Sequence, residues 1–344
     1  MYLQELKIVM KKMKFYPLPQ AGPWPAQDPF IFCAYHEDDY PKGEANLGPA
    51  KTSLRGRQMG SDFNPASNWR MYHGQEIPGF PYHPHRGFET LTIVEKGWVD
   101  HTDSHGGAGR YSAGDLQWLT AGRGLLHSEM FPLVEQEKEN PLRLFQIWLN
   151  LPSKQKMVDP QYKMFWSHQL VEKEEQGARF RLWAGQFGPY KAPEPPAASW
   201  ASQKSRDFMV LRIDLEAGAK FTIPKASSTE SWGRLYLYEG GDIQANGQKM
   251  PLRHYMSWLA QEELELVAGP GGAKLLYLQA PPIEEPVWQR GPFVMDSSER
   301  LQEAFKDYRA GKFGKWPWPE DEHHFGPKKE RFARHADGRE ERLD

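Results

Sequence analysis

Two short histidine motifs contain the side chains best suited to chemistry in this sequence. His83-Pro84-His85 and His127-Ser128-Glu129 each separate two potential metal ligands by one residue. A β-strand directs residues i and i+2 to the same face, so two neighbouring strands would point three imidazoles and one carboxylate into a shared space. Such a set suits a divalent transition ion. It leaves coordination positions open, which is typical of a reactive rather than a structural site.

The sequence around the two motifs predicts the strands that would position them. An alternating run from Phe88 to Val94 follows the first motif and is typical of a β-strand. A turn-rich stretch at 103–109 and a short run at 113–122 precede the second motif, so His127 would return beside the first pair in a barrel-like arrangement. With 12 histidines in the chain, one isolated pair would mean little, and Glu129 could be a solvated hairpin residue. The two motifs together favour metal binding.

Composition limits the class of protein. The length of 344 residues predicts two domains, and 31 Gly with 29 Pro indicate many turns and few long helices. The 43 basic and 45 acidic residues nearly cancel, so we expect neither nucleic acid nor a membrane surface as a partner. There is no apolar run long enough to span a bilayer, and the N-terminus lacks the apolar core of a signal peptide. The single cysteine, Cys33, fits a reducing compartment, and we expect a cytoplasmic protein.

The chain divides into four stretches. Residues 1–30 look like an N-terminal extension, and 31–160 form a series of short strands that ends near 144–150. Residues 161–290 contain a loop or linker at 191–203 and a second strand series at 208–215, 234–239 and 274–279. This second half has no His-x-His motif. Its His254 stands alone and is interpreted as a packed or surface residue, so the metal site is expected in the first half.

Residues 291–344 differ in character. Ser297 is a plausible N-cap, and Leu301, Phe305 and Tyr308 would share one face of a helix over 297–310. Beyond Pro319 the chain is dense in both charges, and we expect a mobile tail or a solvated helix there.

Several long motifs resemble the pirin family of bicupins. They are the stretches 83–90, 114–124 and 127–130, with further matches at 146–151, 156–162, 285–287 and 291–295. The resemblance runs from about residue 30 to residue 315. It implies an all-β protein of two cupin (jelly-roll) β-barrels in tandem, with a short C-terminal helical segment. Residues 31–160 would be the metal-binding N-terminal cupin, and 161–290 a C-terminal cupin that lacks metal ligands.

The same resemblance implies that His83, His85, His127 and Glu129 hold one divalent transition ion. Fe(II) is the first choice, with Cu, Mn, Ni, Co or Zn as alternatives. In many cupins a glutamate four residues after His-x-His binds the metal, and Glu89 occupies that offset. We prefer Glu129, because the second cupin motif usually lacks a glutamate at that position and this chain has one. Glu89 is expected to contact a ligand from outside the coordination sphere or to line the pocket wall.

Some bacterial pirins open flavonols such as quercetin, so the resemblance implies a metal-dependent dioxygenase acting on a small planar aromatic substrate and O₂. Glu129 would be the catalytic base that accepts the 3-hydroxyl proton. Phe88, Trp118 and Phe131 could wall a planar ligand or simply pack in the core. Arg86 and Arg123 lie near the motifs, in surface, salt-bridge or substrate-contacting positions.

The alternative comes from pirins that resemble regulators. In that class the oxidation state of iron changes the surface presented to a protein partner. The N-terminal extension and the tail with Trp316-Pro317-Trp318 depart from typical pirins, so no partner contact of the family is carried over to this chain.

Overall fold

The structure is a computed structural model that describes residues 13–20, 22–203 and 207–343. Two compact units emerge. Of the described residues, the N-terminal unit contains those within 20–169, 195–202 and 283–343, and the C-terminal unit contains those within 13–19, 170–194 and 203–282. The domain limits inferred from the sequence stay a prediction, because compact packing does not establish an independently folding domain. No helix in the described ranges is both long and apolar enough to cross a membrane.

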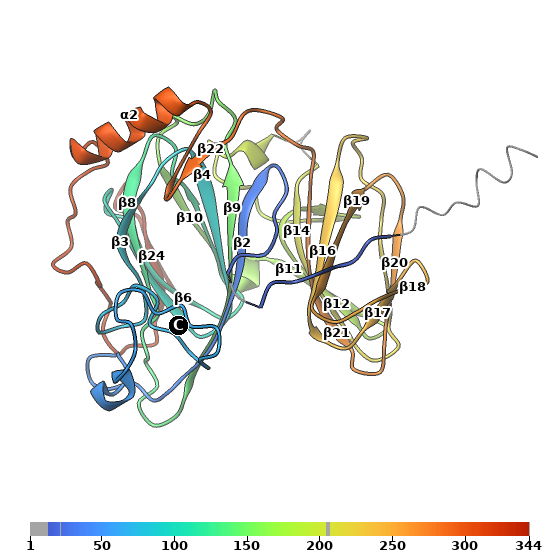
Figure 1. The fold of residues 1–344 in the computed structure, drawn as a ribbon, viewed down its shortest axis with the longest axis horizontal. Coiled ribbons are helices and arrows are strands. Elements are labelled where there is room, and N and C mark those ends of the chain that lie inside the picture. Colours follow the sequence, from blue (N-terminus) through green and yellow to red (C-terminus); the bar gives the residue numbers. More distant parts are fainter. Residues whose placement is uncertain (1–12, 21, 204–206, 344) are drawn as a thin grey trace, which may run out of the picture. The chain divides into compact units, whose positions relative to one another are not determined.

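The N-terminal unit consists mainly of two antiparallel β-sheets (Figure 1). One sheet has the strand order β10 (Gln161–Phe165), β7 (Leu116–Thr120), β4 (Phe88–Lys96), β9 (Asn140–Asn150) and β2 (Phe30–Tyr40). The other has the order β25 (Glu340–Leu343), β24 (Arg331–Arg334), β6 (Ala108–Ser112), β5 (Trp98–Asp103), β8 (Leu125–Met130) and β3 (Gly79–His85). The unit also contains three short 3-10 turns, η1 (Lys51–Leu54), η2 (Ser167–Gln169) and η3 (Trp200–Ser202), and the hairpin β22 (Trp288–Arg290) with β23 (Phe293–Met295).

Alternation of side chains explains why these sheets pack face to face. Val94 of β4 and Leu144 of β9 belong to the same buried cluster as Val99 of β5 and Tyr111 of β6. Strands with one apolar face lower their free energy by burying that face against a second sheet. The strands predicted at 88–94 and 144–150 are confirmed within β4 and β9.

The predicted helix is confirmed as α2 (Ser298–Arg309). Ser297 is its N-cap, and the Ser297 hydroxyl accepts the Arg300 backbone N–H at 3.2 Å. Leu301 packs in a cluster with Phe293 and Phe313, and Phe305 and Tyr308 contact that cluster. The cap and the apolar face thus act as the sequence predicted.

The expectation for the charged tail was wrong. Residues 331–334 and 340–343 form the hairpin β24–β25, and β24 pairs with β6. Phe332 and Ala333 are buried. The local composition is highly charged, but the exposed edge of β6 supplies a pairing partner more than two hundred residues away in the sequence, and no local pattern could reveal it.

The C-terminal unit also has two antiparallel sheets. The larger one follows the order β1 (Tyr16–Pro17), β19 (His254–Leu259), β16 (Trp232–Gly240), β21 (Ala273–Ala280), β14 (Met209–Leu215), β12 (Ala178–Phe187) and β11 (Val171–Glu175), with β13 (Tyr190–Lys191) paired to β12. The smaller one has the order β15 (Lys220–Ile223), β20 (Leu264–Ala268), β17 (Ile243–Ala245) and β18 (Gln248–Met250). The strands predicted at 208–215, 234–239 and 274–279 are confirmed. Residues 1–12 of the predicted N-terminal extension lie outside the described residues.

Candidate metal centre

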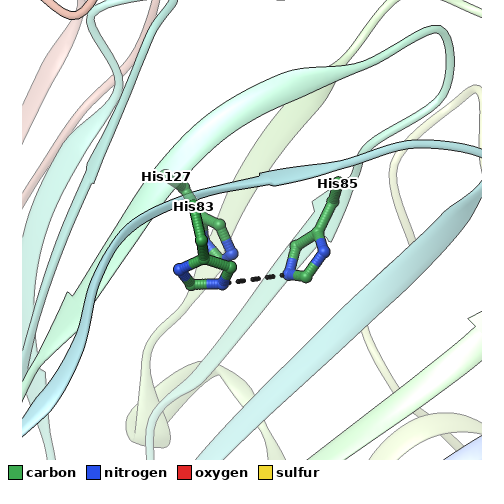
Figure 2. A group of neighbouring side chains, drawn as sticks. All are labelled: His83, His85 and His127. Carbon is green, nitrogen blue, oxygen red and sulfur yellow. Dashed lines mark hydrogen bonds between the residues drawn. The ribbon is translucent and has the colours of Figure 1, made fainter. Parts of the chain in front are cut away.

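Three histidines from two paired strands converge inside the N-terminal unit. His83 and His85 come from β3, and His127 comes from β8, where it lies directly opposite His83 in the strand register. Their ligand nitrogens all lie within 4.8 Å of one another, and the Nε2 atoms of His83 and His85 are 3.2 Å apart (Figure 2). The two-residue spacing places His83 and His85 on one face of β3, as expected for a strand.

The electrostatics of the cluster favour neutral imidazoles. Desolvation by burial lowers the pKa of His83 to about 4, and it lowers the pKa of His85 and His127 well below the ordinary value. The Nδ1 atom of His83 donates to the Pro81 carbonyl at 2.8 Å, which leaves the Nε2 lone pair directed at the cluster. Neutral imidazole is the form that binds a metal.

Burial without partners also fits a bound ion. His127 is fully buried, and neither of its ring nitrogens has a hydrogen-bond partner among the described residues. A buried polar atom left without a partner destabilises a fold, and a coordinated metal ion would supply a partner for one of these two nitrogens. In the described ranges this is the one group of three or more His, Cys, Asp or Glu side chains that converges in this way. His254 of the C-terminal unit instead contacts the Leu252 carbonyl through Nδ1 at 3.0 Å.

Glu129 lies two residues after His127 on β8, but its carboxylate is held by other groups. Oε1 accepts hydrogen bonds from the Thr92 hydroxyl at 2.6 Å and the Tyr111 hydroxyl at 3.4 Å. Oε2 accepts one from the Gln146 amide at 2.8 Å. Burial raises the pKa of Glu129, and these hydrogen bonds partly oppose the rise. The carboxylate does not join the converging histidine group, so its role as fourth ligand stays a proposal.

Glu89 lies on the opposite face of β4 from Thr92, the residue that bonds Glu129. The two residues are three positions apart on β4, and successive side chains of a strand alternate between its faces. In the register with β7, Glu89 pairs with Thr120 and Thr92 pairs with Gln117. The buried Glu89 carboxylate accepts hydrogen bonds from the Thr120 hydroxyl at 2.6 Å, the Ser199 hydroxyl at 2.8 Å and the Trp118 indole at 3.2 Å. Burial raises its pKa to about 7. Its hydrogen bonds thus go to these three donors on the face of β4 away from Thr92.

One buried residue near the cluster was not singled out from the sequence. His101 of β5 lies opposite Glu129 in the register, and its ring is 5.5 Å from the ring of His127. Its Nδ1 lies 2.9 Å from the Gln117 amide, and its Nε2 lies 3.4 Å from Asp103. The two-residue spacing of His101 and Asp103 could have suggested that both side chains lie on one face of a strand. The pairing of that strand with β8, however, cannot be predicted from the local sequence.

Two family models match this chain. The family model described as Pirin matches residues 18–149, and the one described as Pirin C-terminal cupin domain matches residues 210–314. The chain belongs to the pirin family. Both units are therefore cupin domains in tandem, as the sequence predicted.

Curated relatives and solved structures agree with this membership. The chain is 36% identical to Pirin-1 of Arabidopsis thaliana, over 69% of this chain and 78% of that protein. It is 34% identical to a Pseudomonas aeruginosa protein named "Putative quercetin 2,3-dioxygenase", over 74% of this chain and 82% of that one. A crystal structure of quercetin 2,3-dioxygenase from Acinetobacter baumannii superposes with a TM-score of 0.69 at 25% identity, covering 88% of this chain and 98% of that one.

Aromatic side chains surround the cluster in this pirin-family chain. Between ring centroids, His85 lies 4.8 Å from Phe88 and 5.3 Å from Trp148, and Phe80 lies 6.4 Å from His83. Phe131 contacts Phe80 at 6.1 Å. Of the aromatic residues predicted to wall a ligand, Phe88 and Phe131 therefore lie on the side of the histidines. Trp118 does not, because it donates to Glu89 on the opposite face of the sheet.

Four side chains at the cluster are partly accessible to solvent: Phe80, His83, Gln146 and Trp148. Pro81 and Tyr82, which precede His83 on β3, are also partly exposed. Arg86 is buried and pairs with Asp307 at 2.9 Å, and Arg123 pairs with Asp159 at the surface. Both arginines thus form salt bridges.

Proposed function

We propose that this protein is a metal-dependent dioxygenase that opens flavonols such as quercetin. The mononuclear centre would consist of His83, His85, His127 and Glu129. The observation that carries the proposal is the convergence of three neutral imidazoles beside accessible aromatic side chains. The names of two relatives, from Pseudomonas aeruginosa and Acinetobacter baumannii, support the substrate class.

The three histidines, with Glu129 as the proposed fourth ligand, would hold one divalent ion, with Fe(II) as the first choice and Cu, Mn, Ni, Co or Zn as alternatives. When bound, the ion would supply positive charge and open positions for a deprotonated substrate hydroxyl and O₂. Because the histidines are neutral, only Glu129 would offset the charge of the ion. The remaining positive charge favours an anionic substrate oxygen.

Glu129 would accept the proton of the flavonol 3-hydroxyl. The hydrogen bonds from Thr92, Tyr111 and Gln146 fix its carboxylate in one orientation. Burial raises its pKa, so the carboxylate holds a proton more readily than it would in water. Phe80 and Trp148 offer flat apolar surfaces against which a planar substrate can stack.

Oxygen uptake by the iron-loaded protein with a panel of flavonols tests the proposal. We expect uptake with quercetin and none with a flavone that lacks the 3-hydroxyl group. Glu129→Gln retains an oxygen that can coordinate but cannot accept the proton, so turnover should fall by about 10²–10⁴-fold, well beyond any loss of metal.

A metal-replete wild-type protein that consumes no O₂ with any flavonol would refute the dioxygenase. If such a protein changed its binding to a protein partner on iron oxidation, the regulatory alternative would replace it. A fully active Glu129→Gln variant would remove the base role from Glu129 and leave the activity standing.

A further inference from the structure

The strand that carries two of the three histidines is an edge strand. In the six-stranded sheet β3 is last in order, and among the described strands it pairs with β8. On its other side an isolated bridge joins Gly79, at the start of β3, to Tyr72. The rest of that edge would otherwise present unpaired backbone groups. The segment 316–343, here called the C-terminal strap, lies beyond residue 314, where the match to the family ends. This strap reaches both edges of the sheet.

At one edge the strap contacts β3 next to His83. The Tyr82 backbone N–H donates to the Asp321 carbonyl at 3.0 Å, and the Tyr82 ring packs 5.1 Å from Trp316. A backbone group of the exposed strand edge is thereby paired.

One residue later, the strap holds the segment that leads into β3. The Glu322 carboxylate accepts the backbone N–H of Gln75 at 2.5 Å through Oε1, and those of Glu76 and Ile77 at 3.0 and 3.1 Å through Oε2. Ile77 packs in turn against Met130 of β8, and Gly79 begins β3. Hydrogen bonds to a charged acceptor are stronger than neutral ones, so one carboxylate fixes three consecutive peptide groups.

The strap is itself anchored to the same sheet. The Trp318 indole donates to the Asp103 carbonyl at 2.9 Å, and the Phe325 N–H donates to the Asp100 carboxylate at 3.0 Å. Arg110 of β6 pairs with Asp100 and donates to the Gly326 and Lys328 carbonyls. Beyond them β24 pairs with β6, on the side of the sheet away from β3. Glu322 is therefore tied to the sheet on which the histidines lie.

We propose that Glu322 is a positioning residue of the metal centre, acting through the 75–77 backbone to fix β3 and the approach of His83 and His85 to the ion. Because the strap and the histidines share one sheet, a loosened 75–77 segment lets β3 shift relative to β8. That shift changes the orientation of the His83 ligand nitrogen relative to that of His127. The inference rests on the metal-binding part of the proposed function and does not depend on the substrate.

Cobalt(II) titration of the full-length protein tests this role, because the visible d–d spectrum of the bound ion reports ligand geometry. Glu322→Ala should shift the spectrum and weaken Co(II) binding about 10-fold, the lower end of the loss expected for an outer partner of a metal ligand. Glu322→Gln keeps one acceptor oxygen, so it should restore part of both properties. Glu320→Gln makes the same chemical change at an exposed position of the strap and should match the wild type.

Each outcome bears on the proposal. A folded Glu322→Ala variant with wild-type spectrum and affinity overturns it, even if its melting temperature falls, because the role would then be structural only. If Glu320→Gln changes the spectrum and the affinity as much as Glu322→Gln does, the proposal is also overturned. If Glu322→Ala does not fold, a wild-type spectrum for Glu322→Gln overturns it. Failure of the wild type to bind Co(II) refutes the metal centre itself, whereas an absent flavonol activity leaves this test unaffected.

Discussion

Two buried glutamates of the N-terminal unit differ in the groups that surround their carboxylates. Glu129 shares its face of the sheet with the histidines and accepts hydrogen bonds from Thr92, Tyr111 and Gln146. Glu89 lies on the other face of β4 and accepts from Trp118, Thr120 and Ser199. Because Glu129 lies on the histidine face, it is the carboxylate that we propose for the metal and the substrate. Glu89 instead joins β4, β7 and the 195–202 segment.

Glu89 should make stability depend on pH. Burial raises its pKa from 4.5 to about 7 in the folded state, so the folded protein holds this proton more tightly than the unfolded chain. The resulting stabilisation is fully present below pH 4.5 and is lost as the pH rises through 7. Glu89→Gln, which mimics the protonated side chain, should therefore gain stability relative to the wild type across this range, by up to about 3 kcal/mol.

Urea unfolding of both proteins at several pH values measures this difference. A constant difference between Glu89→Gln and the wild type from pH 4.5 to 8 would show that the carboxylate titrates as it does in water.

At the scale of elements, a buried ion pair connects β5, β6 and the C-terminal strap. Asp100 is fully buried and Arg110 nearly so, and two hydrogen bonds of 2.6 Å join them. The same guanidinium also donates to two backbone carbonyls of the strap, so it forms hydrogen bonds both with Asp100 and with the strap. Removal of one partner from such a pair leaves an uncompensated buried charge.

Arg110→Met should therefore lower the free energy of unfolding by about 3–5 kcal/mol. Arg334→Met removes an arginine of the same sheet whose ion pair with Glu340 is exposed, and it should cost less than about 1 kcal/mol. Denaturant unfolding of the two variants provides the comparison. Similar losses in both would show that the buried pair contributes no more than a surface one.

The sequence predicted the elements whose signals are local. Alternation identified the strands at 88–94 and 144–150, and the Ser297 cap with its apolar face identified α2. Pairing of β24 with β6 escaped prediction, because hydrophobic patterning does not reveal a partner so far away in the sequence.

The site was predictable to the same extent. The two histidine motifs could be predicted as ligand pairs because residues two apart on a strand lie on the same face. The partners of Glu129 come from three other strands, and the contacts of Glu322 join segments about 245 residues apart, so both depend on register and tertiary packing.

At the scale of the whole molecule, the two cupin domains differ in their cores. The N-terminal domain encloses histidines and a polar row that includes Thr92, Gln117 and Gln146. The C-terminal core described here is dominated by aliphatic side chains, such as Leu211, Leu235 and Leu275. A fold used twice, with a converging histidine group found in one copy among the described residues, predicts a single metal ion per chain.

Metal content therefore tests the central claim most directly. Protein reconstituted anaerobically with iron and freed of loosely bound ions should contain about one ion per chain by elemental analysis, as expected for one complete ligand set. His127→Ala should lose nearly all of that metal, whereas His254→Ala, in the C-terminal domain, should retain it. Two ions per chain, no retained iron in the wild type, or full occupancy in His127→Ala would contradict the account.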